Sequence, residues 1–301
     1  MHSWNDILLE IEKHQLEQPH AIDCVRREYI KKLYKKEGRN VIAYYSGWLQ
    51  KPDYEGSGLV DNDMNGFAIT VKNLDPDKGL DLVLHTPGGD PFATEAIVSY
   101  LHGVFKEDIR AIVPQLAMSA GTMVACACKQ ILMGKYSSLG PIDPQFGGVP
   151  ASGVIEEFVQ AKKEVKQDPS SALLWQLIIR KYHPTFLGEC KNAMDWAEEI
   201  VKKWLQEHMF AEAKDRAKIA KDVAAHLCDH KRHKNHGRHL SLENCKKIGL
   251  NVQSIEDDLD GESQDLVFTI HRMYMHTFER TRALKIIENH LGESMIHEIS
   301  D

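Results

Sequence analysis

The sequence predicts an α/β fold in which repeated strand–helix units form a parallel sheet. First, short runs of aliphatic and β-branched residues recur near residues 41, 80, 109 and 131. Second, segments with apolar residues at helical spacing separate these runs, as in parallel strands joined by crossover helices. Third, the 301 residues are 43% hydrophobic and 27% charged, a composition that can bury a core. We therefore expect an α/β domain with further helices at both ends of the chain.

Composition and charge exclude several classes of protein. The formal net charge of −7 argues against a general nucleic-acid binder. The longest apolar run, residues 116–128, is too short to span a bilayer. The first residues lack the basic and then apolar pattern of a signal peptide, and the six cysteines are scattered. We therefore expect a cytoplasmic protein without disulfide bonds.

The first half of the chain alternates predicted helices and strands. An amphipathic helix or helix pair is expected over residues 4–37. The run Val41-Ile-Ala-Tyr-Tyr-Ser46 predicts the first strand, and a glycine-rich loop follows it. The next predicted elements are a helix at 62–73, a strand at 80–85, a helix at 93–105, a strand at 109–114, a helix at 117–128 and a short strand at 131–133.

The second half is predicted to be mainly helical after an ordered loop at 136–146, which contains too many glycines and prolines for regular structure. Helices are expected at 155–169, 187–227, 241–249 and about 264–290, with a histidine-rich loop at 230–239. The predicted organisation is an N-terminal helical segment at 1–39, a main α/β domain at 40–252 and a C-terminal helical extension at 253–301.

Two segments carry the chemistry: Leu82-Val-Leu-His-Thr-Pro-Gly-Gly89 and Ala117-Met-Ser-Ala-Gly-Thr122. The first predicts a buried strand that runs into a glycine turn, whose free N–H groups could hold an oxyanion or a phosphate. The patterns G-x-G-x-x-G and G-x-x-x-x-G-K-[ST] are absent, so a nucleotide site is not predicted. The second segment places Ser119 before an apolar helix, either as a helix cap or as a nucleophile favoured by the helix N-terminus.

The two segments together resemble the peptidase branch of the Clp-protease/crotonase superfamily, and most closely the serine dehydrogenase proteinase family, which is related to the signal peptide peptidases. Two further stretches support this resemblance: Ser137-Ser-Leu-Gly-Pro-Ile-Asp-Pro-Gln145 and residues 237–250, from Gly237-Arg-His to Ile-Gly-Leu250. The four segments occur in the order of the family and cover roughly residues 40–252. The resemblance implies a Clp-protease/crotonase-like fold with repeated strand–helix units.

The resemblance also implies roles for individual residues. Ser119 would be the nucleophile, and backbone N–H groups of Gly88 or Gly89 and of Ala120 would form the oxyanion hole. The general base departs from the Clp pattern, because Asp143 stands near the place where those proteases have a histidine. Asp143 could orient a base or cap its loop.

Signal peptide peptidases use a serine–lysine dyad instead, and the corresponding stretch here is Ile179-Arg-Lys-Tyr-His-Pro184. Lys181 is therefore the first predicted base and His183 the second. A buried lysine can have its pKa lowered enough to act as a base, whereas an exposed one at a helix end cannot.

The histidine-rich segment is a second cluster of reactive side chains. His226 and His230 stand at i and i+4, a spacing that suits zinc ligands. However, Lys and Arg residues interleave with the histidines and would repel a cation, so a solvated basic loop is expected and no metal or other cofactor. One histidine of this loop, His236 or His239, is a third choice for the base.

The resulting prediction is a cytoplasmic serine endopeptidase, a hydrolase that cleaves peptides or unfolded proteins through an acyl-enzyme. The fold implies a homo-oligomer, with the helices at 187–227 and 264–290 as assembly surfaces or as core. Two alternatives stay open: a catalytically silent oligomeric scaffold or adaptor, and a crotonase-type acyl-CoA enzyme that uses the same oxyanion hole.

Overall fold

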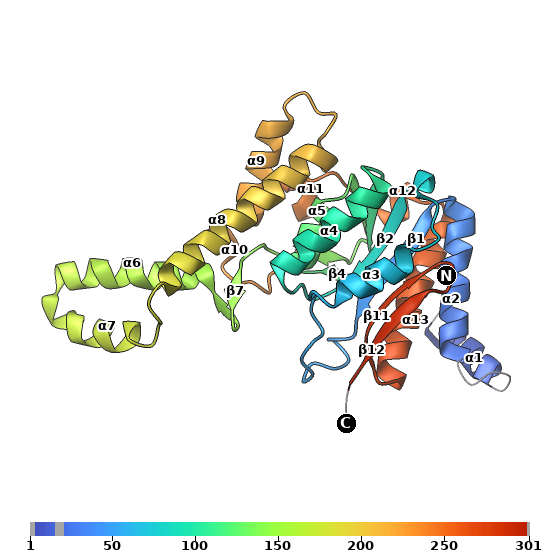
Figure 1. The fold of residues 1–301 in the computed structure, drawn as a ribbon, viewed down its shortest axis with the longest axis horizontal. Coiled ribbons are helices and arrows are strands. Elements are labelled where there is room, and N and C mark those ends of the chain that lie inside the picture. The colour runs from blue at the N-terminus through green and yellow to red at the C-terminus, as the bar shows by residue number, and fades with distance from the viewer. Residues whose placement is uncertain (1–3, 16–20, 300–301) are drawn as a thin grey trace.

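The centre of the molecule is a twisted sheet whose inner strands are almost entirely buried, so helices must cover both of its faces (Figure 1). The computed structural model describes residues 4–15 and 21–299. In this described part, seven strands form the sheet in the order β10-β5-β3-β2-β1-β11-β12. Their bounds are β1 Asn40–Ser46, β2 Leu80–His85, β3 Ile109–Val113, β5 Gln130–Met133, β10 Val252–Ser254, β11 Ala283–Asn289 and β12 Ser294–Glu298.

The strands from β10 to β1 run parallel to their neighbours, whereas β11 runs antiparallel to β1 and β12 runs antiparallel to β11. The predicted α/β class with a mostly parallel sheet is therefore confirmed. The four strands expected near residues 41, 80, 109 and 131 are β1, β2, β3 and β5. Continuous aliphatic runs reveal such strands because both of their faces are buried.

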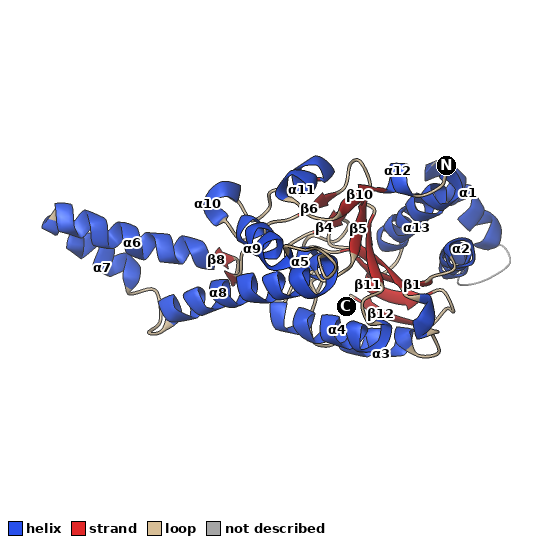
Figure 2. Cartoon of the chain, turned by 90° about the horizontal axis from the view of Figure 1, so that it is seen from above, coloured by secondary structure: helices blue, strands red, loops and turns tan. Residues whose placement is uncertain are grey.

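Each face of the sheet has its own set of helices (Figure 2). One face is covered by α1 Trp4–Gln15, α2 Ala21–Glu37, α12 Ile255–Asp258 and α13 Gly261–Arg280. The other is covered by α3 Asp63–Val71, α4 Pro91–Phe105, α5 Ala120–Cys126, α8 Phe186–Trp204, α9 Arg216–Leu227 and α11 Leu242–Ile248. The helix α5 lies on this second face, so the segment that contains Ser119 packs against the larger of the two hydrophobic clusters.

Short strands connect the sheet to the loops near Ser119. Strands β4 Leu116–Ala117, β6 Ser138–Leu139 and β9 Leu240–Ser241 form a small sheet, in which β4 and β6 are parallel. Thr86, which follows β2, pairs with Ala117. These pairings bring the end of β2, the start of α5 and the loop after β6 to one place.

An arm of helices projects away from the sheet (Figure 1). It consists of α6 Ala151–Gln167, α7 Ala172–Ile179 and the first turns of α8, and it begins at the hairpin of β7 Gln145–Phe146 and β8 Val149–Pro150. Its own core is small and centres on Ala151, Val154 and Cys190. The arm therefore adds little to the stability of the body and leaves apolar side chains on its surface.

Two predicted helices differ from the structure. The helix predicted at 264–290 ends at Arg280, and residues 283–289 form strand β11 instead. Helical spacing of apolar residues continues across the boundary without a proline or glycine, so the local pattern does not mark the change. The helix predicted at 187–227 is divided into α8 and α9, with a π-helical turn at Leu205–Met209 before the break. Packing of α9 back onto α8 buries Ala220, Ala224 and Leu227 and explains the reversal.

The N-terminal helices are present as α1 and α2, and residues 16–20 of the predicted segment 4–37 lie outside the described residues. The division of the chain into 1–39, 40–252 and 253–301 stays a prediction about folding units. Strand β11 pairs with β1 over five residues, from Ile42–Asn289 to Ser46–Lys285. The last segment therefore contributes strands to the main sheet as well as the helix α13, and α13 serves as core, with most of its residues buried.

Candidate active site

The turn after β2 has a backbone conformation that requires glycine. Gly88 has φ of 102° and Gly89 has φ of 153°, both in the region that other residues rarely adopt. A Cβ on Gly89 would lie 2.2 Å from the Leu59 backbone nitrogen. The segment around Leu59 is bonded to this turn, because Leu59 N–H donates to the Gly88 carbonyl and Asp90 N–H donates to the Leu59 carbonyl, each at 2.8 Å. The turn is thus fixed from both sides.

Ser119 lies directly against this turn. It is the residue before α5 and has φ of 50° and ψ of −113°, a strained conformation for a residue with a side chain. A Cβ on Gly88 would lie 2.7 Å from the Ser119 Cβ and 3.0 Å from the Ala120 nitrogen. Only glycine therefore permits the close approach of the two segments. Strain of this kind is common where a side chain has to be presented to a ligand.

The three predicted oxyanion-hole residues differ in the state of their N–H groups. The Gly88 N–H donates to the Thr86 Oγ1 at 3.1 Å. Neither Gly89 N–H nor Ala120 N–H has an acceptor among the described residues. The structure thus leaves Gly89 and Ala120 free to donate to a ligand beside Ser119, whereas Gly88 supplies the close contact and not a free donor.

A cavity of about 300 Å³ opens beside Ser119. Gly89 and Ala120 also line it, together with Asp143 from the loop after β6. The remaining wall is mainly apolar and comes from α4, α5, α8 and the 142–146 loop: Phe92, Met123, Ile142, Phe146 and Trp196. The rings of Phe92 and Trp196 lie 4.8 Å apart. The cavity can therefore accept an apolar group next to the serine.

The loop that carries Asp143 is fixed to α5. The Thr122 hydroxyl bonds the Ala117 and Gly140 carbonyls and accepts the Gly140 N–H, each at 2.9 Å. Asp143 is 4% exposed. Its carboxylate accepts from the Ser152 hydroxyl at 3.1 Å and lies 3.1 Å from the His230 Nδ1.

Two histidines of the histidine-rich segment lie near this carboxylate. His230 contacts Asp143 directly. Burial lowers the pKa of His236, the Asp143 carboxylate opposes this effect, and His230 adds to it. His236 is partly buried and its Nδ1 has no partner among the described residues. The pair of Asp143 and His230, 87 residues apart, is the contact that sequence reasoning missed. The only signal for it in the sequence is that the predicted 136–146 loop contains an aspartate while histidines are concentrated in another segment of the chain.

The other predicted bases lie elsewhere. Lys181 and His183 are exposed in the connection between α7 and α8, in the arm. The His183 ring contacts the Pro184 carbonyl at 2.8 Å and lies 3.7 Å from Glu189. His239 is exposed. None of the three lines the cavity that contains Ser119. Among the described residues, no group of three His, Cys, Asp or Glu side chains is placed to hold a metal ion.

A serine in a strained turn at the start of a helix, with two free N–H groups beside it, is what a serine hydrolase requires of its fold. The comparison with known families agrees with this class. The chain belongs to the family of ClpP-like SDH-type serine proteinases, whose model matches residues 7–260.

Two archaeal relatives show how far the similarity extends. The chain is 29% identical over 258 residues to the uncharacterized protein MJ0137 of Methanocaldococcus jannaschii, and the match covers 84% of this chain and 79% of that protein. It is 31% identical over 148 residues to the uncharacterized protein MJ1495 of the same organism, covering 48% of this chain and 50% of that protein. In the described part of the chain, no helix has the length and apolar character needed to cross a membrane.

Proposed function

We propose that this protein hydrolyses peptide bonds in peptides or unfolded proteins through an acyl-enzyme formed on Ser119. The observation that carries this proposal is the contact between Ser119 and Gly88, which leaves the N–H groups of Gly89 and Ala120 free beside the serine. Family membership supports a serine peptidase over the acyl-CoA enzyme considered from the sequence.

The proposed reaction has two stages. A base takes the proton from the Ser119 Oγ as this oxygen attacks the carbonyl carbon of the substrate. The carbonyl oxygen becomes an oxyanion, which accepts hydrogen bonds from Gly89 and Ala120. The base then returns the proton to the leaving amine, and water hydrolyses the resulting ester by the same steps. The apolar wall of the cavity binds the side chain next to the scissile bond.

We assign the base to His236, with Asp143 as the group that orients the imidazole. Burial favours the neutral form of His236, which is the form that accepts a proton. His230 already contacts Asp143 and would hold the carboxylate in place. His236 does not line the cavity, so the 230–239 segment has to move toward Ser119 when substrate binds. Lys181 or His183 could serve Ser119 only from the arm of another copy, and these residues form the second choice.

Reaction with a fluorophosphonate probe tests this assignment, because the probe phosphonylates only an activated serine. Intact-protein mass spectrometry should show one adduct on the wild type and none on Ser119→Ala. His236→Ala should label slowly, whereas Lys181→Ala and His183→Ala should label at the wild-type rate. Ser171→Ala, which removes a partly exposed serine of the arm, is the matched control. Labelling of Ser119→Ala at the wild-type rate would falsify the assignment of the nucleophile.

A catalytically silent scaffold is the second proposed function, because no histidine or lysine among the described residues lines the cavity with Ser119. This function predicts a folded protein that does not react with the probe and still binds unfolded polypeptides. A cytoplasmic location remains a prediction, which fractionation of cells that express the protein would check.

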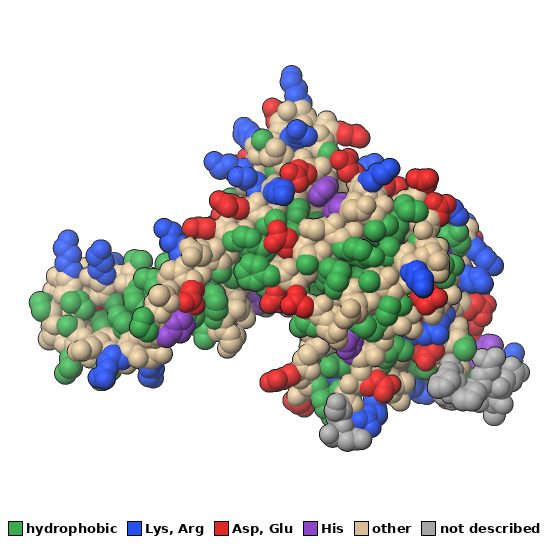
Figure 3. All heavy atoms as spheres, viewed as in Figure 1, with side chains coloured by type: hydrophobic (Ala, Val, Ile, Leu, Met, Phe, Trp, Pro, Cys, Tyr) green, Lys and Arg blue, Asp and Glu red, His purple; other side chains and the backbone are tan. Residues whose placement is uncertain are grey.

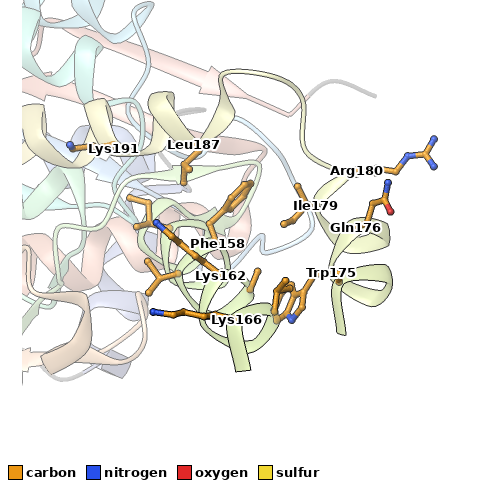
Figure 4. A pocket seen from close by; sticks show the side chains of 14 residues that line it. Phe158, Lys162, Lys166, Trp175, Gln176, Ile179, Arg180, Leu187 and Lys191 are labelled. Atoms are coloured by element: carbon orange, nitrogen blue, oxygen red, sulfur yellow. The ribbon is translucent and has the colours of Figure 1, made fainter. Parts of the chain in front are cut away.

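We further propose that the protein forms a homo-oligomer through the arm. Exposed leucines at 173, 174 and 177 lie on α7, and Val159 on α6 is 64% exposed. A groove of about 1200 Å³ lies between α6, α7 and the start of α8, with Phe158, Trp175 and Ile179 at its wall and lysines at its rim (Figure 4). Figure 3 shows that apolar side chains are gathered on this arm, where they contribute little to the core of their own chain.

Charges on α6 favour a second copy as the partner of this surface. Glu156, Val159 and Lys163 lie on one face of α6, at helical spacing. If two α6 helices pack antiparallel about a two-fold axis, Glu156 faces Lys163 of the partner subunit at both ends, with Val159 near the centre. A surface that is complementary to itself in this way fits a symmetric dimer interface.

A further inference from the structure

The histidine-rich segment 230–239 contains basic residues that the proposed reaction does not use. In the structure, a pocket of about 250 Å³ lies between this segment, the end of α9 and the helix α11. Its polar lining consists of His226, Arg232, His233, Arg238, Asn244 and Lys247. The pocket therefore lies on a part of the segment that contacts α9 and α11, and it is separate from the cavity beside Ser119.

The lining of the pocket has an excess of positive charge. Three of its residues are cations, and none of its lining residues is acidic. The Arg238 Nη1 donates to the Arg232 carbonyl at 2.8 Å, and Lys247 is exposed without an ion pair among the described residues. The nearest carboxylate that the structure gives to these cations is Asp229, which lies 3.7 Å from the Arg232 Nε. One carboxylate at that distance does not neutralise three cations.

The His226 ring accepts a hydrogen bond from the Arg232 Nη1, but a neutral ring does not compensate the charge of the arginine, and the pKa values of both histidines reflect the same positive field. Burial lowers the pKa of His226, and the charges of Arg232 and Arg238 lower it further. Burial also lowers the pKa of His233, again with a contribution from both arginines. The His233 Nε2 donates to the His226 carbonyl at 2.7 Å, so this ring is fixed against α9. A bound anion would relieve the uncompensated charge.

We propose that this pocket binds a small phosphate-bearing ligand, with Arg232, Arg238 and Lys247 as the cations that hold its phosphate group. A phosphate dianion suits the site because guanidinium groups donate in pairs to phosphate oxygens, and a singly charged carboxylate would leave more of the positive charge uncompensated. Asn244 can add a neutral donor. Its Oδ1 accepts from the Ser241 N–H at 3.3 Å, so its Nδ2 group is the part left for a ligand.

Such a ligand would also act on the proposed active site, and this part of the inference rests on the proposed function. The segment that carries Arg232 and Arg238 also carries His230, which contacts Asp143, and His236. A phosphate group would tie both arginines to Lys247 on α11, a helix of the body. It would therefore fix the two ends of the stretch between residues 232 and 238, with His236 inside it.

Thermal unfolding with inorganic phosphate tests the site without any measurement of activity. Titration at constant ionic strength should raise the unfolding temperature of the wild type in a saturable manner. Arg238→Gln and Lys247→Gln should each weaken phosphate binding by about tenfold or more, because each removes a charged donor. Lys247 is exposed and has no ion pair with any residue that the structure describes, so its replacement leaves the fold intact. Lys234→Gln, which removes an equal charge from the same segment outside the pocket lining, should bind phosphate as the wild type does.

Three results would overturn the inference: equal phosphate affinity of Lys247→Gln and wild type, an equal loss in Lys234→Gln, or an equal shift produced by acetate in place of phosphate. Comparison of inorganic phosphate with a sugar monophosphate distinguishes the source of the phosphate group. Tighter binding of the sugar phosphate identifies a phosphorylated metabolite, and equal binding identifies free phosphate.

The effect on the active site is measured separately by the rate of Ser119 labelling. Phosphate should slow labelling of the wild type severalfold, because it holds the 230–239 segment where His236 does not line the cavity, and should leave the rate of Lys247→Gln unchanged. If phosphate binds and the wild type labels at the same rate with and without it, the coupling is wrong while the binding site stands. If the wild type does not label at all, the proposed function fails, and the unfolding experiment still decides the phosphate site.

Discussion

At the scale of single residues, the site depends on backbone conformations that few residues can adopt. Ser119 has positive φ although it bears a side chain, and Gly88 has positive φ and no room for one. The two residues hold each other in place, because the turn and the serine occupy adjacent van der Waals space. The nucleophile is thus presented by strain that the neighbouring turn supports.

Gly88→Ala should therefore strongly slow the reaction at Ser119. The new methyl group would lie 2.7 Å from the Ser119 Cβ, and φ of 102° disfavours any side chain. We expect the labelling rate to fall by about a hundredfold or more, as for displaced oxyanion donors. Gly103→Ala is the matched control, since a Cβ there meets nothing within 4 Å and the position is within α4. This control should label normally and gain roughly 1 kcal/mol in free energy of unfolding.

The dependence of labelling on pH should identify the base. Burial lowers the pKa of His236 from its ordinary value of 6.5, so the neutral imidazole persists at slightly acidic pH. As the pH falls through this lowered pKa, the imidazole gains a proton and can no longer accept one from Ser119. We expect a rate that is constant above neutrality and declines with a midpoint below 6.5. A midpoint in the alkaline range would contradict His236 and indicate a lysine base.

At the scale of elements, strand β11 contributes a lysine that fixes the segment bonded to the glycine turn at Gly88 and Gly89. Lys285 is 1% exposed, and its Nζ donates to the Gly58 carbonyl at 2.7 Å and to Asp63 at 2.8 Å. Asp63 is fully buried and accepts from the Val60 N–H at 3.1 Å. Burial lowers the pKa of Lys285, and the Asp63 carboxylate opposes this effect. The pair thus fixes residues 58–60, which bond to the glycine turn.

Replacement of this ion pair should therefore reduce catalysis more than stability. Buried ion pairs can often be replaced by neutral side chains with little loss in free energy of unfolding. In Lys285→Met/Asp63→Asn we expect kcat to fall by about tenfold to a hundredfold with KM nearly unchanged, because the oxyanion donors shift. Peptide hydrolysis and thermal unfolding are measured in parallel.

The matched control for this variant is Arg26→Met, which breaks the other fully buried ion pair on β11, that with Glu288. This pair does not touch residues 58–60. The control should lower the unfolding temperature and leave kcat of the folded protein unchanged. An equal fall in kcat in both variants would mean that Lys285 has only a structural role.

The same strand shows which elements sequence patterns can predict. Strands β1, β2 and β3 are evident because parallel strands buried on both faces are continuous aliphatic runs. Strand β11, Ala283-Leu-Lys-Ile-Ile-Glu-Asn289, contains two charged residues and follows a helix without a break in periodicity. Both charges are buried against residues more than 200 positions away, Asp63 and Arg26. Only the tertiary structure supplies those partners, so the local sequence resembles a solvated helix.

The residues of the candidate site also differ in how far the sequence can predict them. Ser119 and the glycine turn follow from short motifs, because their chemistry depends on neighbouring backbone groups. The contact of Asp143 with His230 joins two loops that are distant in sequence, and nothing in either loop specifies the other. Lys181 and His183 were suggested by a resemblance that concerns the order of segments along the chain. Such an order does not specify positions in space, and both residues lie in the arm.

At the scale of the whole molecule, the arm projects from the body and leaves a hollow between them (Figure 3), so α6 is accessible to a second copy.

If two copies pair through α6, reversal of the charge at Glu156 alone should separate them, and reversal at both Glu156 and Lys163 should restore pairing. Glu156→Lys should give a monomer in sedimentation velocity, and Glu156→Lys/Lys163→Glu should recover the oligomer. Leu291→Glu, which alters an exposed leucine of the body, serves as control and should not change the mass. An unchanged oligomer in Glu156→Lys would contradict the antiparallel arrangement.

The pairing of β11 with β1 has a consequence for synthesis of the protein. A ribosome delivers β1, the glycine turn and Ser119 long before it delivers residues 283–289, which complete the sheet and bring Lys285 to Gly58. A nascent chain therefore carries its serine without the support that fixes the turn beside it. The proposed peptidase activity would therefore be acquired only after residues 283–289 have been synthesised and paired with β1, which spares the growing polypeptide and its neighbours on the polysome from cleavage until then.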